Sequence, residues 1–162
     1  MQTDQVRENL KCRRISVLML FAFALVVCLL VSCKSTAQTH TREVPLQIEL
    51  DAFSGRPNPN WWLTADQVVE FLKKLHALKA APGVHSAPNN LGYRGFVVTA
   101  NGGTVGGYDE LRVYHGLVFA LRGDRTETFI DSERSMEHWL LDSSKSHVSE
   151  SIAQYIQTEI QR

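Results

Sequence analysis

An uncharged apolar run fills residues 15–32, ISVLMLFAFALVVCLLVS, and it directly follows Arg13 and Arg14. A basic flank followed by an apolar stretch is typical of an export signal, while the length also reaches the lower limit of a membrane-spanning helix, about 17–25 residues. The length alone therefore fits both a cleaved signal (1–32) and a retained anchor. In either case residues 33–162 remain for the folded part, enough for one domain of two packed layers.

The apolar run ends in Leu30-Val31-Ser32-Cys33. This tetrapeptide resembles the lipobox of bacterial lipoproteins, which consists of leucine, a small or aliphatic residue, a small residue and cysteine. The resemblance implies cleavage before Cys33 and a membrane anchor of fatty acyl chains, such as palmitate, on its thiol. Two or three acyl chains hold a protein stably because each buried methylene contributes about 0.8 kcal/mol. A signal anchor that is not cut is the alternative.

These features predict that the chain resides in the bacterial cell envelope, facing the periplasm or the exterior. Lys34, the residue after the cysteine, favours the outer membrane in enteric-type bacteria. Residues 33–43 carry the lipidated Cys33 and a polar stretch without apolar periodicity, which predicts a short tether. A single domain then covers 44–162.

The charge and cysteine counts exclude several kinds of partner and site. Residues 1–32 hold four of the 17 basic and two of the 17 acidic residues, which leaves 13 basic and 15 acidic residues after them. We expect no nucleic-acid partner, because such proteins usually carry a basic surplus. All three cysteines lie at or before position 33, so the domain has no disulfide framework and no thiolate site. We expect no cofactor and no metal.

The residue patterns of the domain alternate between strand and helix. Val44, Leu46, Ile48 and Leu50 recur with the period of two that marks a half-buried strand. Thr64 and Gln67 form a capping-box pattern ahead of apolar residues at helical spacing, and Ala80-Ala81-Pro82-Gly83 is expected to end that helix. Further strands are predicted over 93–100, 110–115, 117–122 and 126–130, joined by glycine-containing turns.

Two helices are predicted at the end of the chain. Asp131 or Ser132 caps the first, and apolar residues from 148 to 160 line one face of the second. The order of elements predicts an α+β domain: an antiparallel meander of about five to six short strands with three helices on one face. An N-terminal apolar signal helix precedes it.

The segment 51–62, DAFSGRPNPNWW, contains the candidate binding residues. Its prolines, glycine and asparagines restrict the backbone, so Arg56 could be presented rigidly to a carboxylate or phosphate. Asn58 could add hydrogen bonds, and Trp61 or Trp62 a stacking face. A purely structural interpretation competes with this one: the asparagines satisfy the loop backbone, the tryptophans enter the core and Arg56 pairs with Asp51.

Three blocks of the domain carry a second resemblance. The pattern FSGRPNP-x-W over 53–61, LGYRGF over 91–96 and EHWLL over 137–141 together resemble a group of bacterial proteins without an assigned function. The resemblance implies a recurring domain and carries no activity.

Catalytic residues are harder to find in the sequence. No histidine pair has zinc-site spacing, and no nucleophile motif occurs. His115, in a predicted turn, has Asp109 nearby in the sequence, and such a pair could act as a general base. Three hypotheses follow: a binding or interaction domain for an envelope protein or small ligand, an extracytoplasmic hydrolase or transferase with a site near Arg56 and His115, and a structural envelope protein.

Overall fold

The computed structural model describes residues 44–162. The predicted signal segment (1–32) and the whole of the tether (33–43), Cys33 included, lie outside the described residues. Within the described part, one sheet of seven strands has the order β2-β1-β4-β5-β6-β7-β3, and every neighbouring pair is antiparallel. The strands are β1 (Leu46–Leu50), β2 (Asn60–Trp62), β3 (Lys79–Ala80), β4 (Phe96–Ala100), β5 (Glu110–Tyr114), β6 (Leu117–Arg122) and β7 (Arg125–Ile130).

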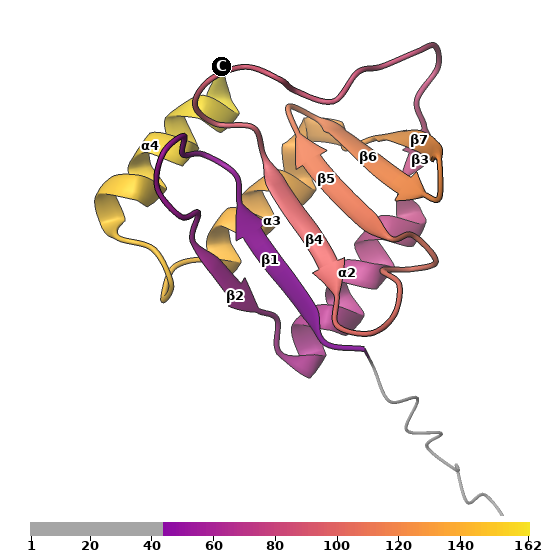
Figure 1. Cartoon of the computed structure of the whole chain (residues 1–162), viewed down its shortest axis with the longest axis horizontal. Coiled ribbons are helices and arrows are strands. Elements are labelled where there is room, and N and C mark those ends of the chain that lie inside the picture. Colours follow the sequence, from indigo (N-terminus) through magenta and orange to yellow (C-terminus); the bar gives the residue numbers. More distant parts are fainter. Residues whose placement is uncertain (1–43) are drawn as a thin grey trace, which may run out of the picture. The chain divides into compact units, whose positions relative to one another are not determined.

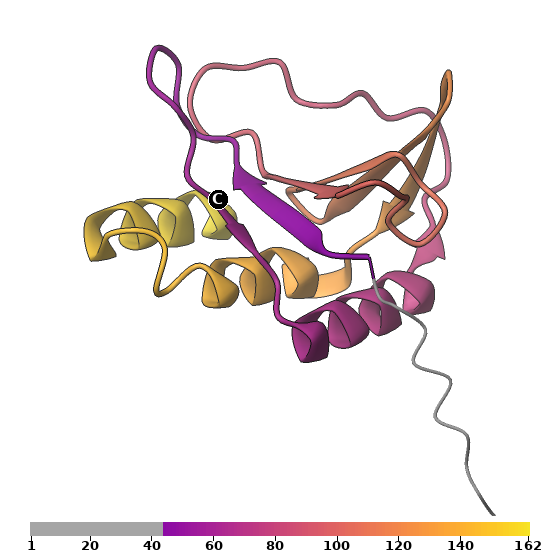
Figure 2. The ribbon, with the colours of Figure 1, turned by 60° about the horizontal axis from the view of Figure 1, so that its bottom comes forward.

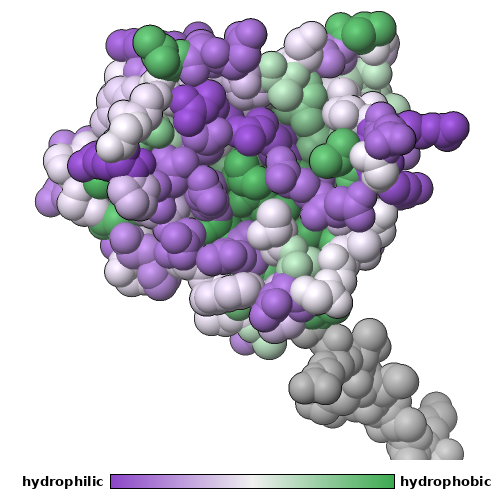
Figure 3. All heavy atoms as spheres, viewed as in Figure 1, coloured by the Kyte–Doolittle hydropathy of each residue, from purple (hydrophilic) through white to green (hydrophobic). Residues whose placement is uncertain are grey.

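Three α-helices lie on one face of this sheet, as Figure 2 shows. They are α2 (Ala65–Ala77), α3 (Ser135–Ser143) and α4 (Glu150–Gln161), and a short 3-10 turn, Ser132–Arg134, leads into α3. The predicted α+β class, antiparallel meander and three helices are therefore confirmed, with β3 as an additional short strand. Figure 3 shows the other face of the sheet, which is mostly hydrophilic around a small apolar area.

The core lies between the sheet and the helices. Leu46, Ile48 and Leu50 of β1 are buried, while Glu49 is exposed on the opposite face, as the alternation predicts. From the helical side, α2 contributes Val68, Phe71 and Leu75. The sheet thus buries its apolar residues on the face covered by helices, and no disulfide is needed to hold this cysteine-free domain together.

Helix α2 begins as predicted but ends earlier than predicted. Thr64 and Gln67 form the reciprocal capping box at its start. The helix stops at Ala77 because Leu78 takes an extended conformation, with ψ of 150°. Lys79 and Ala80 can then pair with Ile130 and Phe129 of β7. A two-residue edge strand is invisible in the sequence because its pairing partner lies about fifty positions away.

Strand β4 begins later than predicted, at Phe96 rather than residue 93. Gly95 has φ of +99°, and a Cβ at that position would lie only 2.2 Å from the carbonyl oxygen of Val113. Only glycine fits so close to the neighbouring strand. Tyr93 and Arg94 therefore precede the strand, and their side chains are free to make long-range contacts.

Helix α3 is capped by Asp131, one of the two predicted residues, although not from the N-cap position. The Asp131 carboxylate accepts hydrogen bonds from the backbone N–H groups of Met136 and Glu137 at 3.0–3.2 Å. Asp131 is buried, and these bonds satisfy donors that a helix N-terminus otherwise leaves without partners.

Candidate functional site

The two ends of strand β1 define two ends of the domain. The chain enters at Val44 beside the loop after β4, where the Asn101 N–H donates to the Pro45 carbonyl at 3.0 Å; we call this the entry end. At the other end of β1 the chain turns into the loop 51–59, next to residues 90–95; we call this the far end. Figure 1 shows the entry end at the bottom of the sheet and the far end at the top.

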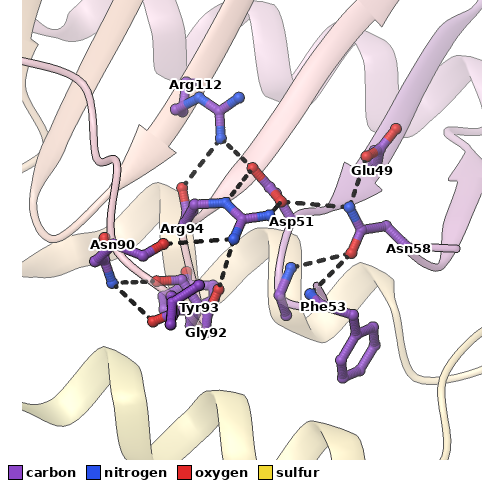
Figure 4. Close-up of polar contacts among 11 residues, drawn as sticks. Glu49, Asp51, Phe53, Asn58, Asn90, Gly92, Tyr93, Arg94 and Arg112 are labelled. Carbon is purple, nitrogen blue, oxygen red and sulfur yellow. Dashed lines mark hydrogen bonds and ion pairs between the residues drawn. The ribbon is translucent and has the colours of Figure 1, made fainter. Parts of the chain in front are cut away.

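Asp51 organises the far end (Figure 4). Its carboxylate accepts hydrogen bonds from the guanidinium groups of Arg94, which engages both carboxylate oxygens, and of Arg112, at 2.6 Å. Asp51 is only 8% exposed, so the two ion pairs are largely shielded from water. One carboxylate thus ties together the end of β1, the loop before β4 and the middle of β5.

The pKa of Asp51 reflects this arrangement. Burial by itself raises the pKa of the carboxyl group, but the hydrogen bonds and charges of Arg94 and Arg112 outweigh burial and hold the pKa below its usual value of 3.8. The hydrogen bond to Asp51 in turn raises the pKa of Arg94. Asp51 is therefore a carboxylate, and Arg94 a cation, across the neutral pH range.

Asn58 holds the loop 51–59 in shape. Its side-chain carbonyl accepts from the backbone N–H groups of Ala52, at 3.2 Å, and Phe53, at 3.0 Å, while its amide donates to Glu49 and Asp51. Asn58 therefore satisfies the loop backbone, as the structural interpretation of this loop expects. Asn60 instead accepts a hydrogen bond from Gln47 on the neighbouring strand.

Arg56 does not pair with Asp51, contrary to the structural interpretation of the loop. Its guanidinium carbon lies 3.6 Å from the centroid of the Phe53 ring, and Arg56 is exposed. Among the described residues it makes no hydrogen bond or ion pair that meets ordinary geometric criteria. Stacking on Phe53 therefore holds the Arg56 guanidinium in place, while the N–H groups of the guanidinium face water.

The two tryptophans have different environments. Trp61 is 3% exposed, donates from Nε1 to the Ser143 hydroxyl at 3.1 Å, and stacks on His147 with ring centroids 5.8 Å apart. Trp62 is 47% exposed and lies opposite Gln47 near the entry end. The candidate residues Arg56, Asn58, Trp61 and Trp62 therefore do not form one site.

Asp109 and His115 are not brought together. They flank β5 at its two ends, six residues apart in extended chain, or about 20 Å. The Asp109 carboxylate instead accepts from the Gly123 N–H at 2.7 Å. The general-base pair that the sequence suggested is therefore absent, because the extended strand β5 separates the two residues.

His115 belongs to a buried polar cluster at the far end. It occupies the turn between β5 and β6 with φ of +46°, and its ring stacks on Tyr114 at 4.1 Å. The fully buried Glu137 carboxylate accepts from the His115 and Gly116 N–H groups and from the Tyr93 hydroxyl at 2.7 Å. Burial, followed by the charge and hydrogen bond of Glu137, raises the pKa of Tyr93, which is therefore a neutral donor.

Glu137 thus fastens α3 to the sheet. Its carboxylate bonds to the backbone N–H of His115 and not to the imidazole ring. His115 Nε2 is buried and has no hydrogen-bond partner within residues 44–162. The same part of the chain contains no cluster of three or more acidic, histidine or cysteine side chains that could hold a metal ion.

The three blocks that resemble other bacterial proteins meet at the far end. Asn58 of the first block bonds to Asp51, Arg94 of the second bonds to the same carboxylate, and Tyr93 of the second bonds to Glu137 of the third. Sequence reasoning missed Arg94, Arg112, Tyr93 and Glu137. For three of these four residues the signal was present, because they lie inside the resembling blocks.

Comparisons with protein-family models, with curated proteins and with solved structures give no match to this chain. In the part of the chain that the structure describes, none of the helices is sufficiently long and apolar to cross a bilayer.

Proposed function

We propose that the chain is a bacterial cell-envelope lipoprotein, anchored by lipid on Cys33. The lipobox pattern Leu30-Val31-Ser32-Cys33 at the end of the apolar run supports the anchor. The chain after Cys33 is free of cysteine, so no thiol within the domain competes for the lipid or for a disulfide. Lys34 favours the outer membrane over the inner one.

The anchor is tested by metabolic labelling with an alkyne fatty acid in a bacterial host. Wild-type chain should take up the label, and Cys33→Ala should reduce it to background and release the domain from the membrane fraction. Cys28→Ala is the matched control, because it removes a thiol only five residues earlier and should leave labelling unchanged. Undiminished labelling of Cys33→Ala would refute the lipoprotein assignment.

We further propose that the domain is a binding module whose far end recognises an anionic group on an envelope protein or small envelope ligand. One observation carries this proposal: Arg56 is held over the Phe53 ring while its guanidinium N–H groups face water. A planar guanidinium held in one orientation can accept a carboxylate or phosphate with both donors, and it loses little freedom on binding.

The hydrogen bonds behind Arg56 explain why the loop 51–59 can keep that orientation. Asn58 bonds the loop to itself, and Asp51 bonds it to Arg94 and Arg112. Preorganisation of this kind is what a binding site requires from its supporting residues. The hydrolase or transferase hypothesis, with a site near Arg56 and His115, loses its suggested general-base pair, because Asp109 and His115 lie at opposite ends of β5.

A two-dimensional NMR titration tests the binding proposal with a defined probe, N-acetyl-trialanine, whose only charge at neutral pH is its carboxylate. Wild type should show saturable shifts confined to residues 53–58, with millimolar affinity, because a single exposed ion pair is weak. Arg56→Ala should lose these shifts, whereas Arg125→Ala, which removes an exposed arginine of β7, should keep them. Identical shifts in Arg56→Ala and wild type would exclude Arg56 as the recognition residue.

A further inference from the structure

Large exposed apolar side chains occur at both ends of the domain, Leu91 at the far end among them. Trp62 is the largest of them and is 47% exposed, which leaves about 100 Å² of its side chain in water. It is the last residue of β2 and lies opposite Gln47, three residues from the point where the described chain enters at Val44. The exposed tryptophan therefore sits at the entry end.

The distance along the chain from the proposed lipid to this tryptophan is short. Ten residues, 34–43, separate Cys33 from Val44. Ten residues of chain span at most about 35 Å. If Cys33 carries lipid, this length of chain keeps Val44, and with it the entry end, close to the bilayer surface.

The charges around Trp62 determine which surface it can contact. The neighbours of Trp62 across the sheet, Gln47 of β1 and Thr99 of β4, carry no charge. These neighbours give Trp62 no charge-based attraction to an anionic surface. An indole ring nevertheless favours the boundary between headgroups and acyl chains, because its apolar body and its N–H group are both accommodated there.

We propose that Trp62 inserts into the bilayer interface and sets the orientation of the lipid-anchored domain, with the far end and Arg56 directed away from the membrane. This inference rests on the proposed lipid anchor at Cys33. Adjacent residues of β2 point to opposite faces of the sheet, so Trp61 is in the core while Trp62 is exposed and available to the lipid surface.

The experiment uses the full chain, produced in a bacterial host so that Cys33 carries its lipid, and reconstituted into vesicles of phosphatidylcholine with brominated acyl chains. Bromine quenches only tryptophans that reach the bilayer. The chain has three tryptophans, Trp61, Trp62 and Trp139, so contact by Trp62 alone should quench about a third of the emission. Trp62→Phe should abolish this quenching, whereas Trp139→Phe, the matched control, should keep it.

Two further conditions separate this inference from other contacts. Salt at 0.5 M should leave the quenching unchanged, because screening weakens only contacts between charges. Phosphatidylglycerol added to the vesicles should likewise leave it unchanged, because Gln47 and Thr99, the neighbours of Trp62 in the sheet, carry no charge. Quenching that is equal in wild type and Trp62→Phe, or absent from wild type, would overturn the inference.

Flotation of the vesicles distinguishes failure of the anchor from failure of the orientation. Wild-type and Trp62→Phe chains should both float with the vesicles, and Cys33→Ala should not. If wild type floats without quenching, the anchor stands and Trp62 does not reach the lipid. If Trp62 instead becomes shielded from aqueous acrylamide only in native membranes, and bromolipid does not quench it, its partner is a protein and the inference is wrong.

Discussion

The far end and the entry end of the domain are built by opposite means. At the far end, charged and polar side chains are largely buried and bonded to one another, with Asp51 between Arg94 and Arg112 and with Glu137 holding the turn at His115. At the entry end, Trp62 is half exposed, and backbone pairing with β1 holds its strand β2 in the sheet. Buried polar networks specify one geometry, whereas an exposed aromatic side chain leaves contact area available for something else.

The difference between the two ends fits two different roles, ligand binding at the far end and membrane contact at the entry end. A rigid end can present Arg56 to a ligand at low entropic cost, and an end with an exposed indole can settle on a lipid surface without a defined partner. Both roles are proposals, and the stability of each end can be measured independently of them.

The largest effect is expected from Asp51→Ala, which breaks the far end. It leaves the two guanidinium groups, each about four-fifths buried, without their acceptor, and should lower the free energy of unfolding by about 2–3 kcal/mol. Urea denaturation measures the loss, and hydrogen exchange should show loss of protection at Ala52 and Phe53. Asp124→Ala, an exposed aspartate near the entry end, is the control and should stay within about 0.5 kcal/mol. Similar losses in both variants would contradict the importance of the network.

A smaller effect is expected from acid. Because the pKa of Asp51 is lower in the folded state than its usual value of 3.8, the unfolded state binds more protons as the pH falls. The stabilisation is fully present above about pH 5 and is lost as the pH falls through the folded-state pKa. Urea midpoints between pH 6 and pH 2.5 measure this, and Asp51→Asn should show a shallower decline than wild type. An unchanged slope would mean that other carboxylates account for the acid sensitivity.

The smallest effect is expected from Trp62→Phe, which should change the free energy of unfolding by no more than about 0.5 kcal/mol. The Trp62 side chain is half exposed, and its indole N–H makes no hydrogen bond within residues 44–162. The adjacent Trp61→Phe should cost about 2 kcal/mol, since it loses the bond to Ser143 and leaves a gap in the core. Thermal unfolding of the two variants side by side measures the difference. Equal losses would show that Trp62 is also a structural residue.

Much of the fold was predictable because its signals are local. The alternation from Leu46 to Leu50, the capping box of Thr64 and Gln67, and the glycine turns each depend on residues within a few positions of one another. Predictions were wrong where a distant partner decided the outcome. Helix α2 ends before Leu78, because Lys79 and Ala80 pair with β7. Strand β4 begins only after Gly95, because the Val113 carbonyl lies against that glycine.

The site was predictable only in part. The sequence singled out the loop around Arg56 and the role of Asn58 in shaping it. It did not indicate that Arg94 and Arg112 are the partners of Asp51, because these residues are 43 and 61 positions from it and converge only through the β1, β4 and β5 pairings. For the same reason it joined Asp109 to His115, which are near in sequence and far apart in space.

The sequence by itself determined the class of fold, the position of the candidate anchor at Cys33 and the stiffness of the loop 51–59, since each of these follows from short-range composition or periodicity. The tertiary structure decided which residues share an end of the domain, and so which of two adjacent tryptophans is buried and which arginine is free. Antiparallel pairing is the physical reason: it reverses the chain at every turn and brings together residues that no local pattern connects.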